Sequence, residues 1–163
     1  MKVDLVKAEK KDHDILYRLL EYSLYDGSQY IDNDIDENGV FPYTYFENYF
    51  KDTDREAYFI KCDDTLVGFT MLNKHLKVLD KNENNYSVAE FLIMPRARRQ
   101  HIGKIAAYKV FDLHKGYYEV QPMDNNPIAK SFWDNVINSY TEGNYELKHF
   151  DDMEDVYVFK SRA

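Results

Sequence analysis

Cysteine, tryptophan, glycine and proline are scarce in this 163-residue sequence, which has one Cys, one Trp, six Gly and four Pro. A single cysteine, Cys62, excludes an internal disulfide and indicates a reducing, cytoplasmic compartment. No His stands beside Cys62, which favours a small buried hydrophobe over an acyl-cysteine nucleophile. No apolar run reaches about 18 residues, so we expect no transmembrane helix and no membrane partner. The N-terminal stretch MKVDLVKAEKKDHD turns polar early and does not read as a secretory signal.

Positive charge is also in deficit. Lys and Arg total 21 against 29 Asp and Glu, a formal net charge of −8. This balance argues against general nucleic-acid binding, which needs a basic face to displace counterions from phosphates. Hydrophobic residues make up 44% of the chain, enough for a sizeable core. We therefore expect one compact domain over residues 1–163.

Hydrophobic periodicity predicts an alternation of strands and helices without repeats. Helical patterns cover Asp12–Leu24, Tyr43–Phe50, a segment from Ile102 that Gly116 ends, and a segment that begins at Asn126-Pro127. Asp12 and Asn126 are the expected N-caps. Strand patterns cover Lys2–Lys7, Ala57–Cys62, Leu66–Leu72, Ser87–Met94, Tyr117–Gln121, Thr141–Lys148 and Met153–Lys160, and Asp63-Asp64 forms a tight turn. Lys74–Asn85 reads as a polar loop. The order predicts an α+β fold: a mixed, mainly antiparallel central sheet of about seven strands with helices on both faces.

A basic segment lies where the strand before Pro95 passes into the next helix. The sequence PRARRQHIGKIAAYK (95–109) carries five cations and no acid. A helix start presents free backbone N–H groups and the positive end of the helix dipole, so a polyanion is the natural ligand. The alternative is a solvated basic turn that balances acids elsewhere.

The same stretch resembles the GNAT superfamily of N-acetyltransferases, whose strand leads into an R/Q-x-x-G-x-G/A loop at a helix start. Here the loop reads Arg98-Arg99-Gln100-His101-Ile102-Gly103, with His101 in place of the first glycine. A later N-x-x-A-x-x-F-[YW] element is matched by Asn126, Ala129, Phe132 and Trp133. The resemblance is clearest over residues 87–137, and it implies a GNAT-like acyl-CoA N-acyltransferase fold.

The resemblance implies acetyl-CoA as co-substrate. Its pyrophosphate would meet the backbone amides and cations of Arg98, Arg99, Gln100, His101, Ile102, Gly103 and Lys104. The pantetheine arm would pair like a strand beside Leu92, Ile93 and Met94, and Asn126 would reach its far side, as a ligand, a plain N-cap or both. His101 keeps its amide, and His tolerates left-handed dihedrals better than branched residues do. No metal is expected.

By resemblance the chain would be an N-acetyltransferase that moves acetyl to a primary amine by direct attack in a ternary complex. The amine must be neutral, so a carboxylate base is wanted. Glu90 lies in an apolar strand, and alternation puts it on the face of Leu92 and Met94. We interpret it as the catalytic base, against a salt-bridged structural Glu. An amide near Ile93 would bind the oxyanion. Trp133 occupies the position where the family often has a proton-donating tyrosine, so the general acid is not assigned.

Acids and aromatic rings gather in the loop after the first helix. Tyr30, Tyr43 and Tyr45 stand around the acidic stretch Asp32–Glu37, a combination that suits a cationic amine of a small molecule or peptide. The alternative is a solvated acidic loop over packed tyrosines. The sequence does not fix the acceptor or the oligomeric state, and a homodimer is one option.

Two other functions are alternatives: calcium binding, and coenzyme A or partner binding without catalysis. Asp34, Asp36, Asn38 and Gly39 repeat the start of an EF-hand loop, but Tyr45 replaces the bidentate Glu at its twelfth position and Pro42 interrupts it. A non-catalytic CoA-binding or partner-binding module on the same fold is the stronger alternative.

Overall fold

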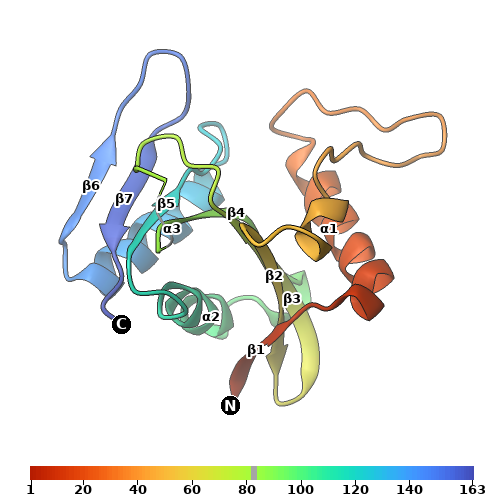
Figure 1. Ribbon diagram of the computed structural model, residues 1–163, viewed down its shortest axis with the longest axis horizontal. Coiled ribbons are helices and arrows are strands. Elements are labelled where there is room, and N and C mark those ends of the chain that lie inside the picture. The colour runs from red at the N-terminus through yellow and green to blue at the C-terminus, as the bar shows by residue number, and fades with distance from the viewer. Residues whose placement is uncertain (82–83) are drawn as a thin grey trace.

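The computed structural model describes residues 1–81 and 84–163 and contains one seven-stranded sheet (Figure 1). Its strands are β1 (Val3–Lys7), β2 (Arg55–Cys62), β3 (Thr65–Asn73), β4 (Tyr86–Ile93), β5 (Tyr117–Val120), β6 (Tyr145–Lys148) and β7 (Val156–Lys160). The helices are α1 (His13–Gly27), α2 (Ile102–Phe111) and α3 (Pro127–Thr141), with short 3₁₀ turns η1 (Lys10–Asp12), η2 (Glu47–Phe50) and η3 (Pro95–Ala97).

The strand order is β1-β2-β3-β4-β5-β7-β6, and all neighbours are antiparallel except β4 and β5. The predicted α+β fold with a mixed, mainly antiparallel sheet is thus confirmed. The predicted β2–β3 turn is also present: Asp63 (φ 48°) and Asp64 (φ 67°) are both left-handed, as a two-residue hairpin loop requires.

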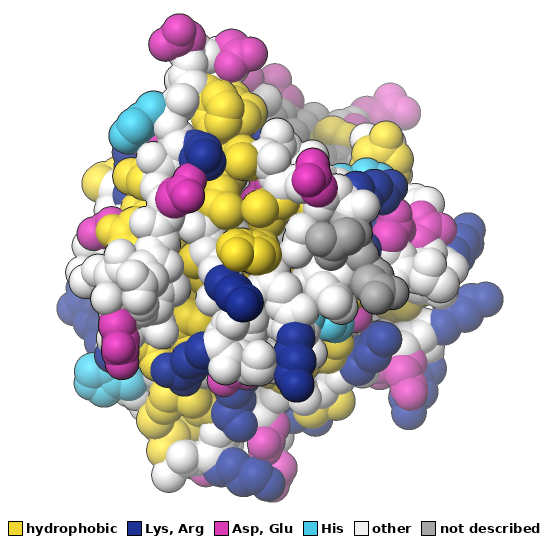
Figure 2. All heavy atoms as spheres, turned by 60° about the vertical axis from the view of Figure 1, so that its left-hand side comes forward, with side chains coloured by type: hydrophobic (Ala, Val, Ile, Leu, Met, Phe, Trp, Pro, Cys, Tyr) yellow, Lys and Arg dark blue, Asp and Glu magenta, His cyan; other side chains and the backbone are white. Residues whose placement is uncertain are grey.

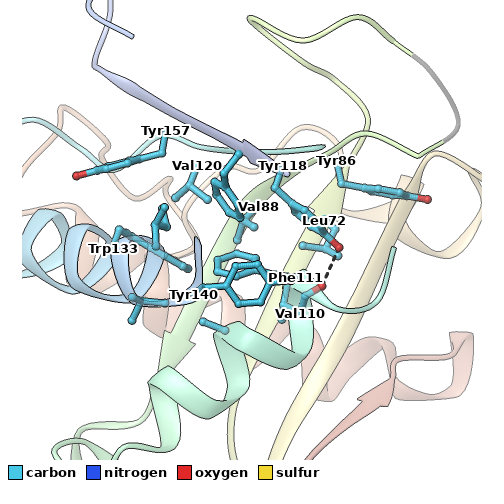
Figure 3. Packing of buried hydrophobic residues seen from close by; sticks show 14 of the residues in the cluster. Leu72, Tyr86, Val88, Val110, Phe111, Tyr118, Val120, Trp133, Tyr140 and Tyr157 are labelled. Carbon is cyan, nitrogen blue, oxygen red and sulfur yellow. Dashed lines mark hydrogen bonds between the residues drawn. The ribbon is translucent and has the colours of Figure 1, made fainter. Parts of the chain in front are cut away.

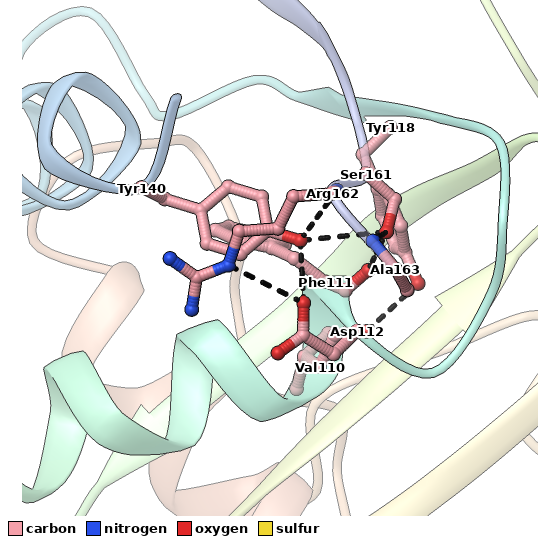
Figure 4. Close-up of polar contacts among 8 residues, drawn as sticks. All are labelled: Val110, Phe111, Asp112, Tyr118, Tyr140, Ser161, Arg162 and Ala163. Atoms are coloured by element: carbon pink, nitrogen blue, oxygen red, sulfur yellow. Dashed lines mark hydrogen bonds and ion pairs between the residues drawn. The ribbon is translucent and has the colours of Figure 1, made fainter. Parts of the chain in front are cut away.

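Helices cover both faces of the sheet (Figure 1). On one face α1 and η2 pack through Leu16, Leu20 and Phe46 against buried residues of β2, β3 and β4. On the other face α2 and α3 form the aromatic core in Figure 3, where the Tyr118 hydroxyl donates to the Val110 carbonyl at 2.7 Å. At the C-terminus, Tyr140 and Ser161 hydroxyls bond Asp112 (2.6 Å) and the Phe111 carbonyl (2.7 Å), which fixes the end of α2 (Figure 4).

Several element boundaries differ from the prediction. The Tyr43–Phe50 helix is reduced to the four-residue η2. Asp12 does not cap α1 through its side chain, because its carboxylate accepts the Glu9 amide at 2.9 Å. α1 runs on to Gly27, α2 ends at Phe111 well before Gly116, and Thr141 belongs to α3 and not to a strand. Two residues of the predicted 74–85 loop, 82 and 83, lie outside the described part.

The central strand β4 has two irregularities that shape the site. Met71 pairs with Glu90 while Leu72 pairs with Val88, so Ala89 is an extra residue, a β-bulge. On the other side, the parallel pairing with β5 is recorded only for Tyr86 to Val88. Val88 pairs with Val120, the last residue of β5, so β4 runs on to Ile93 beyond the end of β5. η3 and the start of α2 follow the end of β4.

Candidate active site

The loop between β4 and α2 forms a concave row of backbone amides. Arg99 (φ 62°) and His101 (φ 64°) are left-handed, a backbone alternation that turns successive N–H groups inward as an anion-binding nest. None of the amides of residues 99–104 donates a hydrogen bond to another residue of the described chain. His101 therefore adopts the conformation that a glycine favours at this place, and the N-terminus of α2 completes the cradle.

Cations also concentrate near this end of the molecule. On the face in Figure 2, most of the Lys and Arg side chains lie in the lower half, with some acidic side chains among them. Since the view is turned about the vertical axis, this lower half is at the level of α2 in Figure 1. Arg96, Arg99 and Lys104 are exposed.

Arg98 is exposed and also makes a contact within the loop. Its Nε donates to the Ile93 carbonyl at 2.8 Å and ties the loop to the end of β4. The Met94 amide donates to Val67 at 2.8 Å. Two backbone groups of the segment expected to pair with pantetheine therefore already have partners, while Leu92 and Ile93 are buried.

Gly103 lies at a close helix contact. A Cβ at this position would lie 3.1 Å from the Phe132 ring and 3.5 Å from Ile93. Gly103 thus lets α2 approach α3 next to the end of β4. This packing accounts for the glycine independently of any phosphate.

Glu90 projects toward α1. Ser23 on α1 donates to its carboxylate at 3.4 Å. Burial raises the pKa of Glu90 to about 7, and hydrogen bonds from Ser23 and Tyr43 oppose the rise only in part. A carboxyl with such a pKa exchanges its proton near neutrality, as a general base must.

A pocket of about 360 Å³ opens beside Tyr43, and Glu90 itself is not among its lining residues. Tyr43, Tyr45, Tyr49, Arg55, Asn73 and His75 are among the residues that line it. Tyr43 belongs to both places, because it lines the pocket and its hydroxyl interacts with the Glu90 carboxyl closely enough to oppose the rise that burial causes in the pKa of Glu90. Burial and the Glu90 charge raise the pKa of Tyr43, so this hydroxyl stays protonated at neutral pH.

The other predicted residues lie in different surroundings. Tyr30 is not among the residues lining this pocket, and its carbonyl accepts a hydrogen bond from Asn125. Asn126 caps α3 by accepting the Ala129 amide at 3.0 Å. Trp133 is buried in the core with its ring 5.1 Å from Phe91.

Sequence analysis did not single out Arg55, Asn73 or Ser23. Arg55 precedes the predicted strand, where the alternation of Ala57 and Phe59 would have placed it on the same face. Asn73 and Ser23 carry no motif, and only the packing of α1 over the sheet brings Ser23 near Glu90.

The comparisons with known proteins agree with this geometry. A model of the acetyltransferase (GNAT) family matches residues 22–136. The chain belongs to this family. GNAT enzymes transfer acetyl from acetyl-CoA to amines, so this chain is a GNAT acetyltransferase by membership. No curated protein matches the sequence significantly.

Solved GNAT structures share the fold at low identity. An acetyltransferase from Thermus thermophilus superposes with a TM-score of 0.69 at 14% identity, covering 98% of this chain and 97% of its own. A GNAT protein from Staphylococcus aureus gives 0.66 at 14%, covering 99% and 100%. The PaiA N-acetyltransferase of Thermoplasma acidophilum, solved with coenzyme A, gives 0.59 at 15%, covering 98% and 99%.

The described residues include neither a group of metal ligands nor a membrane-spanning helix. Within residues 1–81 and 84–163, no three His, Cys, Asp or Glu side chains group as metal ligands would. Asp36 of the EF-hand-like stretch instead accepts the amides of Asn38 (2.8 Å) and Val40 (3.1 Å). No described helix combines the length and apolarity needed to span a bilayer.

Proposed function

We propose that this GNAT protein transfers the acetyl group of acetyl-CoA to a primary amine, with Glu90 as the base. The observation that carries the proposal is the row of amides at 99–104, which lack partners in the described chain and lie at the start of α2. A pyrophosphate supplies several acceptor oxygens for such converging donors. The coenzyme-bound PaiA relative supports the choice of ligand.

The part of β4 that extends beyond the end of β5 suits the pantetheine arm. Pairing with β5 ends at Val88, and the strand continues to Ile93 before the loop begins. An extended arm running along this edge would carry the thioester from the nest toward the middle of β4. Since Arg98 holds the Ile93 carbonyl, we assign Arg98 to positioning the loop as well as to attracting phosphate.

Glu90 would accept the proton of the incoming amine. The neutral amine attacks the thioester carbon, a C–N bond forms, and the C–S bond breaks to release coenzyme A as a thiolate. The ammonium proton passes to the Glu90 carboxylate, directly or through water, and then to solvent. Trp133 supplies no acidic proton, so protonation of the thiolate is not assigned to it.

Paired variants of His101 test the coenzyme site. Gly adopts the left-handed conformation freely, whereas a β-branched Val resists it by about 1–2 kcal/mol. Calorimetric titration with coenzyme A should therefore show His101→Gly binding at least as tightly as wild type and His101→Val about ten-fold more weakly.

Thiol release from acetyl-CoA with a panel of amines separates an enzyme from a non-catalytic binding module. Amine-dependent release above the hydrolysis rate is expected. Absence of coenzyme binding by the wild-type protein would refute the proposed site. Tight binding without release for any amine would favour the binding module.

A further inference from the structure

The tyrosine-lined pocket contains a buried cation at its wall. Arg55 opens β2 and pairs directly with Asn73 at the end of β3. Alternation along β2 puts Arg55 on the face of Ala57 and Phe59, which pack under α1. Both polar side chains therefore lie on the sheet face that carries Glu90.

The positive charge and the Nε–H donor of Arg55 are only partly compensated by neighbouring side chains. The residue is 8% exposed, and its Nε has no hydrogen-bond partner among the described residues. The Asp52 carboxylate stands 3.8 Å from Nε, beyond hydrogen-bond distance, and is engaged by the Asn48 amide at 3.0 Å. The guanidinium lies 4.6 Å from the ring centroid of Tyr45 and 5.5 Å from that of Tyr49. Ring faces stabilise a cation but do not bond the N–H groups in the plane of the guanidinium, so the Nε–H of Arg55 remains available to a ligand.

Neutral polar groups surround this cation. The Asn73 amide donates to the Tyr49 hydroxyl at 3.1 Å, and Tyr49 in turn bonds with Tyr43. His75 also lines the pocket and is paired with Asp54 at 3.2 Å. Among the described lining residues Arg55 is a buried cation, and its ion pair with Asp52 is long, at 3.8 Å. A planar guanidinium beside hydroxyl and amide donors fits a carboxylate, which takes two parallel N–H bonds.

Tyr43 connects this anion site to the proposed base. Its hydroxyl lies near both groups, because it opposes the rise that burial causes in the pKa of Glu90, while burial, the Glu90 charge and Tyr49 raise the pKa of Tyr43. A molecule in the pocket would thus have a cation near one end and a carboxylate base near the other. Such a molecule carries both a carboxylate and an amine.

We propose that the acceptor is an amine bearing a carboxylate, that is, an amino acid or a related ω-amino acid, whose carboxylate binds Arg55 while its amine faces Glu90. The proposal rests on the proposed acetyl transfer and narrows its substrate class. Because Asp52 lies 3.8 Å behind Arg55, a monoanion fits the pocket better than a dianionic phosphate.

Matched amine pairs test this directly. The wild-type protein and acetyl-CoA are assayed with phenylalanine against phenethylamine and with ε-aminocaproate against pentylamine, so each pair differs by one carboxylate. A charge-assisted bond predicts a kcat/KM about ten- to a hundred-fold higher for the carboxylate-bearing member of at least one pair. Equal values, or a preference for the plain amine in both pairs, would overturn the proposal, as would better transfer to phosphoethanolamine.

Variants locate the effect. In Arg55→Gln, the ratio of kcat/KM for the carboxylate-bearing amine to kcat/KM for the plain amine should fall close to one. Arg55→Lys keeps the charge but lacks the planar guanidinium, so it should retain part of the wild-type ratio. Arg162→Gln is the matched control, since Arg162 also lies over two tyrosine rings, 4.4 Å from Tyr140 and 4.9 Å from Tyr108. Its Nε also has a carboxylate, that of Asp112, at 3.7 Å (Figure 4). This control should leave the preference at its wild-type value. An Arg55→Gln protein that keeps the wild-type preference would contradict the assignment.

A binding measurement separates this proposal from the proposed function. Calorimetry with N-acetylphenylalanine and N-acetyl-ε-aminocaproate, in the presence of coenzyme A, should detect binding that Arg55→Gln weakens at least ten-fold. If such binding occurs but no amine is acetylated, the carboxylate site stands and the proposed catalysis fails. If neither carboxylate binds the wild-type protein, the carboxylate site is refuted whatever the turnover.

Discussion

Replacing Glu90 by Gln should affect rate and stability in opposite directions at alkaline pH. Gln keeps the shape of the side chain and removes the base. Loss of a general base usually lowers the rate about 10²–10⁴-fold. The coenzyme dissociation constant should hardly change, because Glu90 faces α1 and not the amides at 99–104.

The stability effect follows from burial of this carboxyl. Raising its pKa from 4.5 to about 7 means that ionised Glu90 costs the folded state about 3 kcal/mol. The folded-state pKa lies above the unfolded value, so the contribution of protonated Glu90 is full below about pH 4.5 and is lost as pH rises through about 7. Wild-type stability should therefore decline over this window, and the decline should disappear in Glu90→Gln.

Two assays measure these effects. Urea unfolding at about pH 5 and about pH 8 should show the variant gaining about 2–3 kcal/mol relative to wild type across the interval. The pH dependence of kcat/KM should have an acidic limb near pH 7 in wild type that vanishes in the variant. Glu21→Gln is a suitable control, since Glu21 on α1 accepts only a long bond (3.3 Å) from the Phe41 amide and should leave both profiles unchanged.

Two results would refute the reasoning. A folded Glu90→Gln protein with wild-type kcat/KM across pH would remove Glu90 from the mechanism. A variant whose melting temperature falls, and whose residual activity follows its folded fraction, would assign Glu90 a structural role only.

Further substitutions test the loop and the helix contacts. Arg98→Glu should raise the coenzyme dissociation constant about ten-fold or more by calorimetry, because it removes both a phosphate-attracting cation and the bond that holds the end of β4; an unchanged value at low salt would contradict this. Gly103→Val should lower stability by about 1–3 kcal/mol in thermal unfolding, because its Cβ would crowd Phe132 at 3.1 Å; unaltered stability would show that α2 can shift. The hydrogen bond to Glu47 raises the pKa of His13, so this pair should stabilise the protein fully below about pH 6.5 and less as pH rises through the raised value. Since His13 is about one-third exposed, the stability difference between wild type and His13→Gln should shrink by less than about 1 kcal/mol over that range, and a constant difference would exclude the linkage.

Local chemistry in the sequence was sufficient for several elements. Asp63-Asp64 tolerates the left-handed pair that a two-residue hairpin needs, and Asn126-Pro127 combines an N-cap with a preset first turn. Alternation after Ala89 correctly put Glu90 on the face opposite Phe91. These features depend on interactions between residues that are neighbours in the chain, so the sequence alone predicts them.

The ends of several helices and strands, and the β-bulge at Ala89, could not be predicted from the sequence. The loss of most of the predicted 43–50 helix, and the extension of α1 to Gly27, depend on packing against β2 and β3 rather than on propensity. The bulge at Ala89 lets Val88 and Phe91 face α2 and α3 while Glu90 faces α1. A register shift is a property of two paired strands, and neither strand alone records it.

The family followed from the sequence motif, whereas the surroundings of Tyr43 and Tyr45 were decided by tertiary structure. The sequence alone pointed to acids and tyrosines of the 30–45 region as a site for a cation. The fold places Tyr43 and Tyr45 beside Arg55, a residue of another strand, and leaves Tyr30 outside the pocket lining. The charge that a pocket presents depends on which distant side chains burial brings together and on which of them find partners. The net charge of this pocket depends on how α1 and η2 pack on the sheet, so it cannot be predicted from residues that are neighbours in the sequence.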